Sequence, residues 1–106
     1  MQNEDNLEII INSNKATAIY FSTEYCNVCK VLKQKVIELL ENDFPNIKFV
    51  YVDIEKQKEV TGQYSIFAVP TLVFFFNGKE SFRKTRNFSL SELYQSIIRP
   101  YSLMFS

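Results

Sequence analysis

Residues 18–40 read AIYFSTEYCNVCKVLKQKVIELL, and the apolar periodicity of this stretch changes halfway along. Its first residues close an apolar run over residues 15–21, which is typical of a buried strand. From Asn27 to about Asp43, apolar residues instead recur every three to four positions between lysines and glutamates, as in an amphipathic helix. Both cysteines of the chain, Cys26 and Cys29, stand at this junction. The stretch therefore predicts a buried strand, a short loop and a long helix that begins just after Cys26.

The location of the two cysteines at a predicted helix N-terminus indicates their chemistry more clearly than their spacing. A helix N-terminus carries unpaired N–H groups and about half a positive charge, so it stabilises a thiolate and lowers the pKa of a thiol there. Cys29 follows about one helical turn later, within reach of a mixed disulfide formed on Cys26. Because position 29 leans toward the apolar side of the helix, we expect Cys26 to attack and Cys29 to resolve.

Strands and helices alternate along the rest of the chain. A short helix is expected at residues 5–13, a strand at 46–54 and a short polar helix at 55–64, ending near Gly62. Asn77-Gly78 is a strong hairpin signal between expected strands at residues 71–76 and 80–85.

A last helix is expected at residues 89–98. Ser89 and Glu92 fit a capping box at its start, and Pro100 should end it. The whole pattern predicts an α/β fold in one domain, residues 1–106, with a central mixed sheet of four or five strands flanked by helices on both faces.

Composition excludes several classes of function. The 106 residues include 46% hydrophobic ones, enough for a real core, and twelve basic residues balance twelve acidic ones, so nucleic-acid binding is not expected. The first residues, MQNEDNLEIIINSNK, lack the basic segment and long apolar run of a signal peptide, and no apolar run is long enough to span a membrane. We therefore expect a cytoplasmic protein without membrane contact.

A second motif, Val69-Pro70-Thr71, gives the cysteine pair its context. Together with AIYF, EYCNVCK, FVYVDIE, YSIFAVPT, FFFNGKE and LSEL, it makes the chain from about residue 5 to 98 resemble the thioredoxin family. The resemblance implies a thiol–disulfide oxidoreductase whose only redox cofactor is its own cysteine pair, active in cell redox homeostasis. It also implies a cis Pro70 facing the cysteines, and a Val69 backbone that pairs with an extended substrate segment.

The chain also departs from the family pattern. Asn27 and Val28 replace the usual Gly-Pro between the cysteines, which leaves the redox potential open, and Arg86 replaces a glycine of the substrate surface. Tyr25 and Ser22 replace two tryptophans. The expected substrate-binding residues are Tyr25, Asn27, Val28, Phe67, Val69, Thr71 and Arg86, of which Tyr25 and Phe67 could equally be ordinary surface aromatics.

The family's buried aspartate and its lysine partner are missing as well. The resemblance places Tyr20 and Phe49 at these two positions, so the chain lacks the usual proton acceptor for the resolving cysteine. Glu24 is expected to point outward and therefore to be a poor substitute. Resolution should then depend on solvent and on the departing thiolate of the substrate.

Other interpretations of the cysteine pair remain open. The domain could be a redox-inactive binding or adaptor module, or a redox-responsive subunit that only reports oxidation. Zinc would need two further ligands besides the cysteines, and the chain has no histidine. The expected partners are a disulfide-containing protein or small thiol and an unidentified electron donor. We expect a monomer whose apolar tail, residues 100–106, packs on the domain or supports a weak dimer.

Overall fold

The strand β1 (Ala16–Ser22) lies inside the sheet, and all seven of its residues are buried. This is seen in a computed structural model that describes residues 4–105. Successive side chains of a strand point to opposite faces. Ala18 and Tyr20 accordingly enter one hydrophobic core, whereas Ile19 and Phe21 enter the other. Because both faces are covered, the strand reads as an unbroken apolar run in the sequence.

The sheet contains four strands in the order β2-β1-β3-β4 within the described residues. Strand β2 (Lys48–Asp53) is parallel to β1, β3 (Thr71–Phe76) is antiparallel to β1, and β4 (Lys79–Thr85) is antiparallel to β3. The β3–β4 turn holds Asn77 and Gly78 at φ values of 57° and 81°, the left-handed region that an Asn-Gly turn accommodates. The predicted mixed sheet and hairpin are confirmed.

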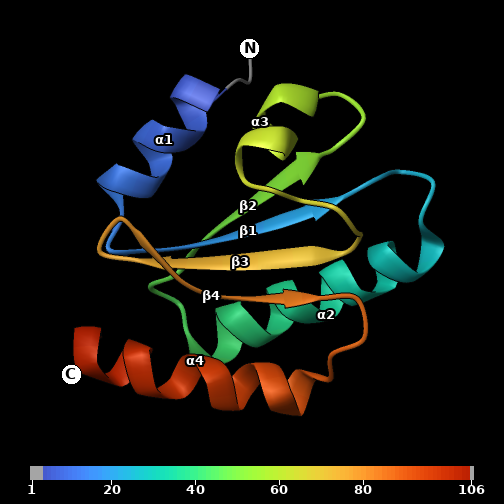
Figure 1. Cartoon of the computed structure of the whole chain (residues 1–106). Helices are drawn as coiled ribbons and strands as arrows, with labels where there is room; N and C mark the ends of the chain where they lie inside the picture. Colours follow the sequence, from blue (N-terminus) through green and yellow to red (C-terminus); the bar gives the residue numbers. More distant parts are fainter. Residues whose placement is uncertain (1–3, 106) are drawn as a thin grey trace.

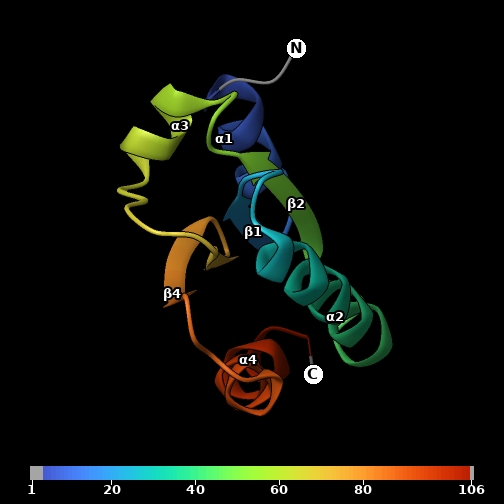
Figure 2. The same cartoon turned by 90° about the vertical axis from the view of Figure 1, so that its right-hand side faces the viewer.

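Two helices cover each face of the sheet (Figure 1). Helices α1 (Glu4–Ser13) and α3 (Lys58–Gln63) lie on one side, and α2 (Asn27–Asp43) and α4 (Leu90–Phe105) on the other, as the turned view also shows (Figure 2). Helix α3 is shorter than the predicted 55–64, because Asp53 closes a turn before it: its side chain accepts from the Glu55 N–H at 2.9 Å.

Helix α4 begins as predicted but ends later. The Glu92 N–H donates to Ser89 Oγ at 3.0 Å and the Ser89 N–H to Glu92 Oε1 at 3.1 Å, which completes the capping box. The prediction that Pro100 ends the helix is wrong, because the helix continues to Phe105. A proline in a helix interior costs about 3 kcal/mol.

The residues beyond Pro100 offset that cost by packing on the core. Tyr101, Met104 and Phe105 all contact the cluster between the sheet, α2 and α4. The Tyr101 ring lies 5.0 Å from that of Phe44, and its hydroxyl accepts from the Asn46 N–H at 3.1 Å. The described part of the tail therefore lies largely against the domain, although Leu103 is exposed.

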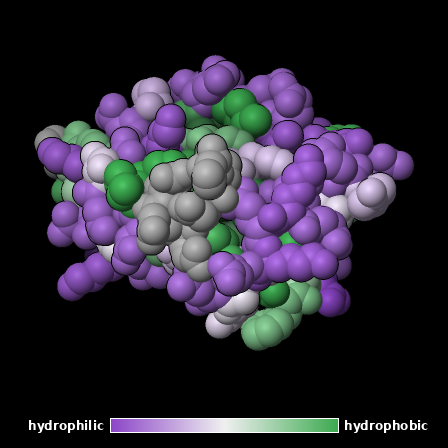
Figure 3. All heavy atoms as spheres, turned by 90° about the horizontal axis from the view of Figure 1, so that it is seen from above, coloured by the Kyte–Doolittle hydropathy of each residue, from purple (hydrophilic) through white to green (hydrophobic). Residues whose placement is uncertain are grey.

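The surface on the α1 and α3 side is mainly hydrophilic. Apolar side chains appear there as small, separate patches (Figure 3). Within residues 4–105, no helix is long and apolar enough to cross a membrane.

Candidate functional site

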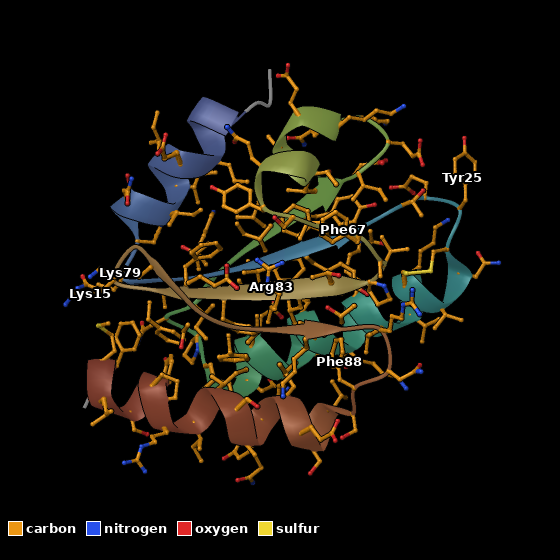
Figure 4. All side chains as sticks on the ribbon, in the orientation of Figure 1. Lys15, Tyr25, Phe67, Lys79, Arg83 and Phe88 are labelled. Carbon is orange, nitrogen blue, oxygen red and sulfur yellow. A yellow bond between two sulfur atoms is a disulfide. The ribbon has the colours of Figure 1, made fainter. Side chains whose placement is uncertain are left out.

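Cys26 and Cys29 lie where the loop after β1 enters α2, and they are joined in a disulfide (Figure 4). Their Cα atoms are 5.2 Å apart. Cys26 is the N-cap residue of α2, with an extended backbone, and the Cys29 N–H donates to its sulfur at 3.1 Å. An N-cap acceptor normally comes from Ser, Thr, Asp or Asn. Here the sulfur of Cys26 takes that place, at the positive end of the helix dipole.

The two cysteines differ sharply in exposure. Cys29 is 1% exposed, on the side of α2 that packs on the sheet, whereas Cys26 is partly exposed. A reagent in solution can therefore reach the sulfur of Cys26 more easily than that of Cys29. The prediction that position 29 faces the apolar side of the helix is confirmed.

The Val69-Pro70-Thr71 segment lies at the same end of the sheet. Thr71 pairs with Phe21, so the start of β3 lies beside the end of β1, from which the chain leads to Cys26. The Val69–Pro70 peptide bond is cis, as the resemblance implied. Thr71 Oγ1 donates to the Ala68 carbonyl at 2.7 Å, and the Arg86 N–H donates to the Pro70 carbonyl at 2.8 Å. Arg86 has a φ of 62°, the left-handed conformation that favours glycine.

Several exposed apolar residues lie in the segments that carry these motifs. Tyr25 is 88% exposed, Val28 75% and Phe67 91%. Tyr25 points away from the body of the molecule beside the start of α2 (Figure 4). Asn27, the first residue of α2, is also exposed. The structure thus leaves Tyr25, Asn27, Val28 and Phe67 on the surface, while Pro70 and Thr71 are buried.

Tyr20 on β1 is a buried residue whose polar group contacts Cys29. It is fully buried, and its hydroxyl donates to the Cys29 carbonyl oxygen at 2.7 Å. Burial raises the pKa of Tyr20 to about 12, with a further contribution from the neighbouring Tyr51. Tyr20 therefore remains a hydrogen-bond donor near neutral pH.

The strand register shows which residues of β2 surround Tyr20. In the parallel β1–β2 pair, Tyr20 lies opposite Tyr51, and Phe49 lies two residues earlier on β2. Both rings contact that of Tyr20, with centroid distances of 6.5 Å for Tyr51 and 6.2 Å for Phe49. Phe49, which the resemblance places at the position of the family's lysine, thus contacts Tyr20, and Tyr51 is a second aromatic neighbour. Sequence reasoning missed Tyr51 because parallel register is set by tertiary packing, although its aromatic side chain on a predicted strand was a signal.

Glu24 is exposed, as expected, but it has two polar neighbours. Its side chain is 57% exposed, yet its Oε2 atom accepts from the Tyr51 hydroxyl at 3.3 Å and its Oε1 atom lies 4.0 Å from Lys30 Nζ. Glu24 and Cys29 line the same cavity, of about 310 Å³. The prediction that Glu24 points outward agrees with this exposure, while the carboxylate also contacts Tyr51 and Lys30.

Arg83 is a second residue that sequence reasoning missed. From β4, its Nη1 atom donates to the backbone carbonyls of Tyr64 at 3.0 Å and Ser65 at 3.3 Å, while Glu80 binds its Nε and Nη2 atoms, each at 2.8 Å. It thereby anchors the turn that leads into Phe67 (Figure 4). Among the described residues, no cluster of three or more His, Cys, Asp or Glu side chains could hold a metal.

An α/β fold with a disulfide at the N-terminus of a helix and a cis-proline segment beside it defines the class of dithiol–disulfide oxidoreductases. Comparisons with known proteins give the family. The family model for thioredoxin matches residues 1–99. YdfQ, a thioredoxin-like protein of Bacillus subtilis, is 33% identical over 97 residues, which cover 92% of this chain and 86% of that protein.

Two further relatives agree with this assignment. Thioredoxin of Mycoplasmoides gallisepticum is 31% identical over 77 residues, or 73% of this chain and 76% of that protein. The X-ray structure of Fasciola hepatica thioredoxin superimposes with a TM-score of 0.82 at 31% identity and covers 92% of this chain and 93% of that one. The chain belongs to the thioredoxin family, and its function is that of a thiol–disulfide oxidoreductase.

Proposed function

We propose that Cys26 is the attacking thiol and Cys29 the resolving thiol of a dithiol couple that reduces or exchanges disulfides. The observation that carries this assignment is the difference in exposure, because Cys29 is 1% exposed while Cys26 caps α2 and reaches the surface. The Cys26 thiolate forms a mixed disulfide with one substrate sulfur and releases the other as a thiolate. Cys29 then attacks the Cys26 sulfur, and the bond from Cys26 to the substrate breaks and releases the second substrate sulfur as a thiolate. The couple becomes oxidised and the substrate gains two electrons.

The surface around Cys26 supports binding of an extended polypeptide. The Val69 backbone would pair with the main chain of the substrate, which recognises a disulfide partner without demanding a particular sequence. Tyr25, Val28 and Phe67 offer exposed apolar contacts near this segment, and Arg86 is fixed to it through the Pro70 carbonyl. Asn27 is a further exposed contact residue, and the buried Thr71 supports the segment through its hydrogen bond to the Ala68 carbonyl.

The proposed partners are disulfide-containing proteins or small disulfides and an unidentified electron donor. The cysteine pair itself is the only redox cofactor in this scheme. We place the domain in the cytoplasm, in cell redox homeostasis, where reduced thiols prevail and a dithiol couple can be recycled. It acts as a monomer, and the exposed Leu103 of the tail is the position through which a weak dimer would form.

Differential alkylation tests the roles of the two cysteines. The reduced protein is treated briefly with iodoacetamide at neutral pH, quenched, unfolded and labelled with an isotopic form of the reagent before mass spectrometry. Cys26 should carry nearly all of the first label. Faster labelling of Cys29 would reverse the assignment, and a protein that never reduces a protein disulfide with a recycling reductant would instead be a binding module.

A further inference from the structure

The cavity behind Cys29 raises the question of where the proton of the resolving thiol goes. Cys29 is 1% exposed, so its thiol cannot pass a proton directly to bulk solvent. Burial also disfavours a thiolate, so attack on a mixed disulfide requires a proton acceptor within reach. The cavity of about 310 Å³ has room for water and a polar lining, the two conditions for a water-mediated path.

Most of the ionisable groups around this cavity cannot take the proton near neutral pH. Burial is the main reason that the pKa values of Tyr20 on β1 and Tyr51 on β2 are raised to about 12, and both hydroxyls act as donors, to the Cys29 carbonyl and to Glu24. Lys30 and Lys33 of α2 line the cavity as cations, which can only donate.

Two carboxylates, those of Asp53 and Glu24, are candidates for the proton acceptor. They differ in whether they line the cavity. Asp53 at the end of β2 is buried, accepts from the Glu55 N–H and does not line the cavity. Glu24 does line it, and among the described residues it is the sole carboxylate to do so. The Tyr51 hydroxyl donates to one of its oxygens and the Lys30 ammonium lies 4.0 Å from the other, and both residues also line the cavity.

We propose that Glu24 is the general base of the resolving step, acting through water in this cavity, with Tyr51 as its positioning residue. The proposal rests on the roles proposed above for Cys26 and Cys29. The Cys29 proton passes to the Glu24 carboxylate as the Cys29 sulfur bonds to Cys26. The bond between Cys26 and the substrate sulfur breaks, that sulfur leaves with the electron pair as a thiolate, and Glu24 returns the proton to it or to solvent.

A stopped-flow experiment with the aromatic disulfide dithiobis(nitrobenzoate) separates the two steps in one trace. The first release of coloured thiolate reports attack by Cys26, and the second reports resolution by Cys29. The released aromatic thiolate is a weak base, so it cannot replace Glu24 as the acceptor. Absence of the first release would contradict the proposed function, whereas only the second release tests Glu24.

Replacing Glu24 by glutamine should slow the second release about tenfold at neutral pH, less than the ~10²–10⁴-fold of fully enclosed bases because the carboxylate is more than half exposed. The wild-type rate should be nearly flat between about pH 6 and about pH 8, and the Glu24→Gln rate should rise with pH as hydroxide takes over. Glu38→Gln, an exposed change elsewhere on α2, is the matched control and should leave both releases unchanged.

The direction of the effect distinguishes a base from a simple charge. If Glu24 acted only through its negative charge, its removal would favour the Cys29 thiolate and accelerate resolution. An unchanged or faster second release in Glu24→Gln would therefore overturn the proposal. Tyr51→Phe keeps the Glu24 carboxylate but removes its hydrogen bond to the Tyr51 hydroxyl, and should slow resolution about two- to threefold. In the Glu24→Gln background the same substitution should have no further effect.

Discussion

The hydroxyl of Tyr20 donates a 2.7 Å hydrogen bond to the backbone carbonyl oxygen of Cys29. It joins the central strand to the first turn of the helix that carries the disulfide, and it is buried. Replacing Tyr20 by phenylalanine removes this buried hydrogen bond and should lower the free energy of unfolding by about 1 kcal/mol.

Urea unfolding of the oxidised protein measures this loss. Tyr51→Phe is the matched control, because its hydroxyl makes an exposed 3.3 Å hydrogen bond and its removal should cost well under about 1 kcal/mol. Equal losses in the two variants would contradict the importance of the buried contact.

The two raised tyrosine pKa values predict a loss of stability at alkaline pH. Tyr20 and Tyr51 both shift from 10.0 to about 12, mainly through burial, and for Tyr51 also through Glu24 and Asp53. Their contribution is complete below about pH 10, where both states hold the protons. Between about pH 10 and about pH 12 the unfolded chain releases protons that the folded protein retains, so stability must fall as pH rises. Urea titrations at about pH 9, 10 and 11 should show this decline, and Tyr20→Phe should make it shallower.

Thr17 on β1 has a buried hydroxyl with no hydrogen-bond partner among the described residues. Thr17→Val keeps the shape and removes the unpaired group, so it should raise the free energy of unfolding by about 1 kcal/mol. Thr71 is equally buried, but its hydroxyl donates to the Ala68 carbonyl, so Thr71→Val should lower stability by about 1 kcal/mol or more. Thermal and urea unfolding of both variants measure these changes. If the two substitutions changed the free energy of unfolding in the same direction, the argument would be refuted.

Pro100 interrupts the hydrogen bonding of α4. An alanine at this position supplies an N–H for the Ser96 carbonyl one turn earlier, and part of that gain is offset because the unfolded chain becomes freer. We expect Pro100→Ala to raise the free energy of unfolding by about 1–2 kcal/mol. Leu103→Ala, at a 77% exposed position of the same helix, should change it by less than about 0.5 kcal/mol. A less stable Pro100→Ala protein would show that the ring packs in a way alanine cannot replace.

Arg83 should affect the use of protein substrates through the turn that it anchors. Arg83→Gln weakens the contacts to the Tyr64 and Ser65 carbonyls, and the exposed Phe67 just beyond them loses a fixed position. If the fixed position of Phe67 contributes about 1 kcal/mol to the binding of a protein substrate, its loss corresponds to an about fivefold lower kcat/KM for insulin reduction. The reaction of Cys26 with dithiobis(nitrobenzoate) needs no such surface and should stay the same. A parallel fall in both rates would assign Arg83 a purely structural role.

Local patterns predicted most of the elements and part of the site. The change of period after Ser22, the Asn77-Gly78 turn and the Ser89–Glu92 capping box each depend on residues within a few positions of one another. The same reasoning failed at Pro100, because a local penalty of about 3 kcal/mol was weighed without the packing of the following residues.

The site shows the same division. The sequence by itself determined that Cys26 caps a helix and that Cys29 lies one turn inside it, since helical periodicity is a local property. Only the tertiary structure decided that Tyr51 lies opposite Tyr20 and that Glu24 and Cys29 line one cavity. Parallel strands are joined through a distant crossover, so their register is set by burial of both faces of the sheet and not by neighbouring residues.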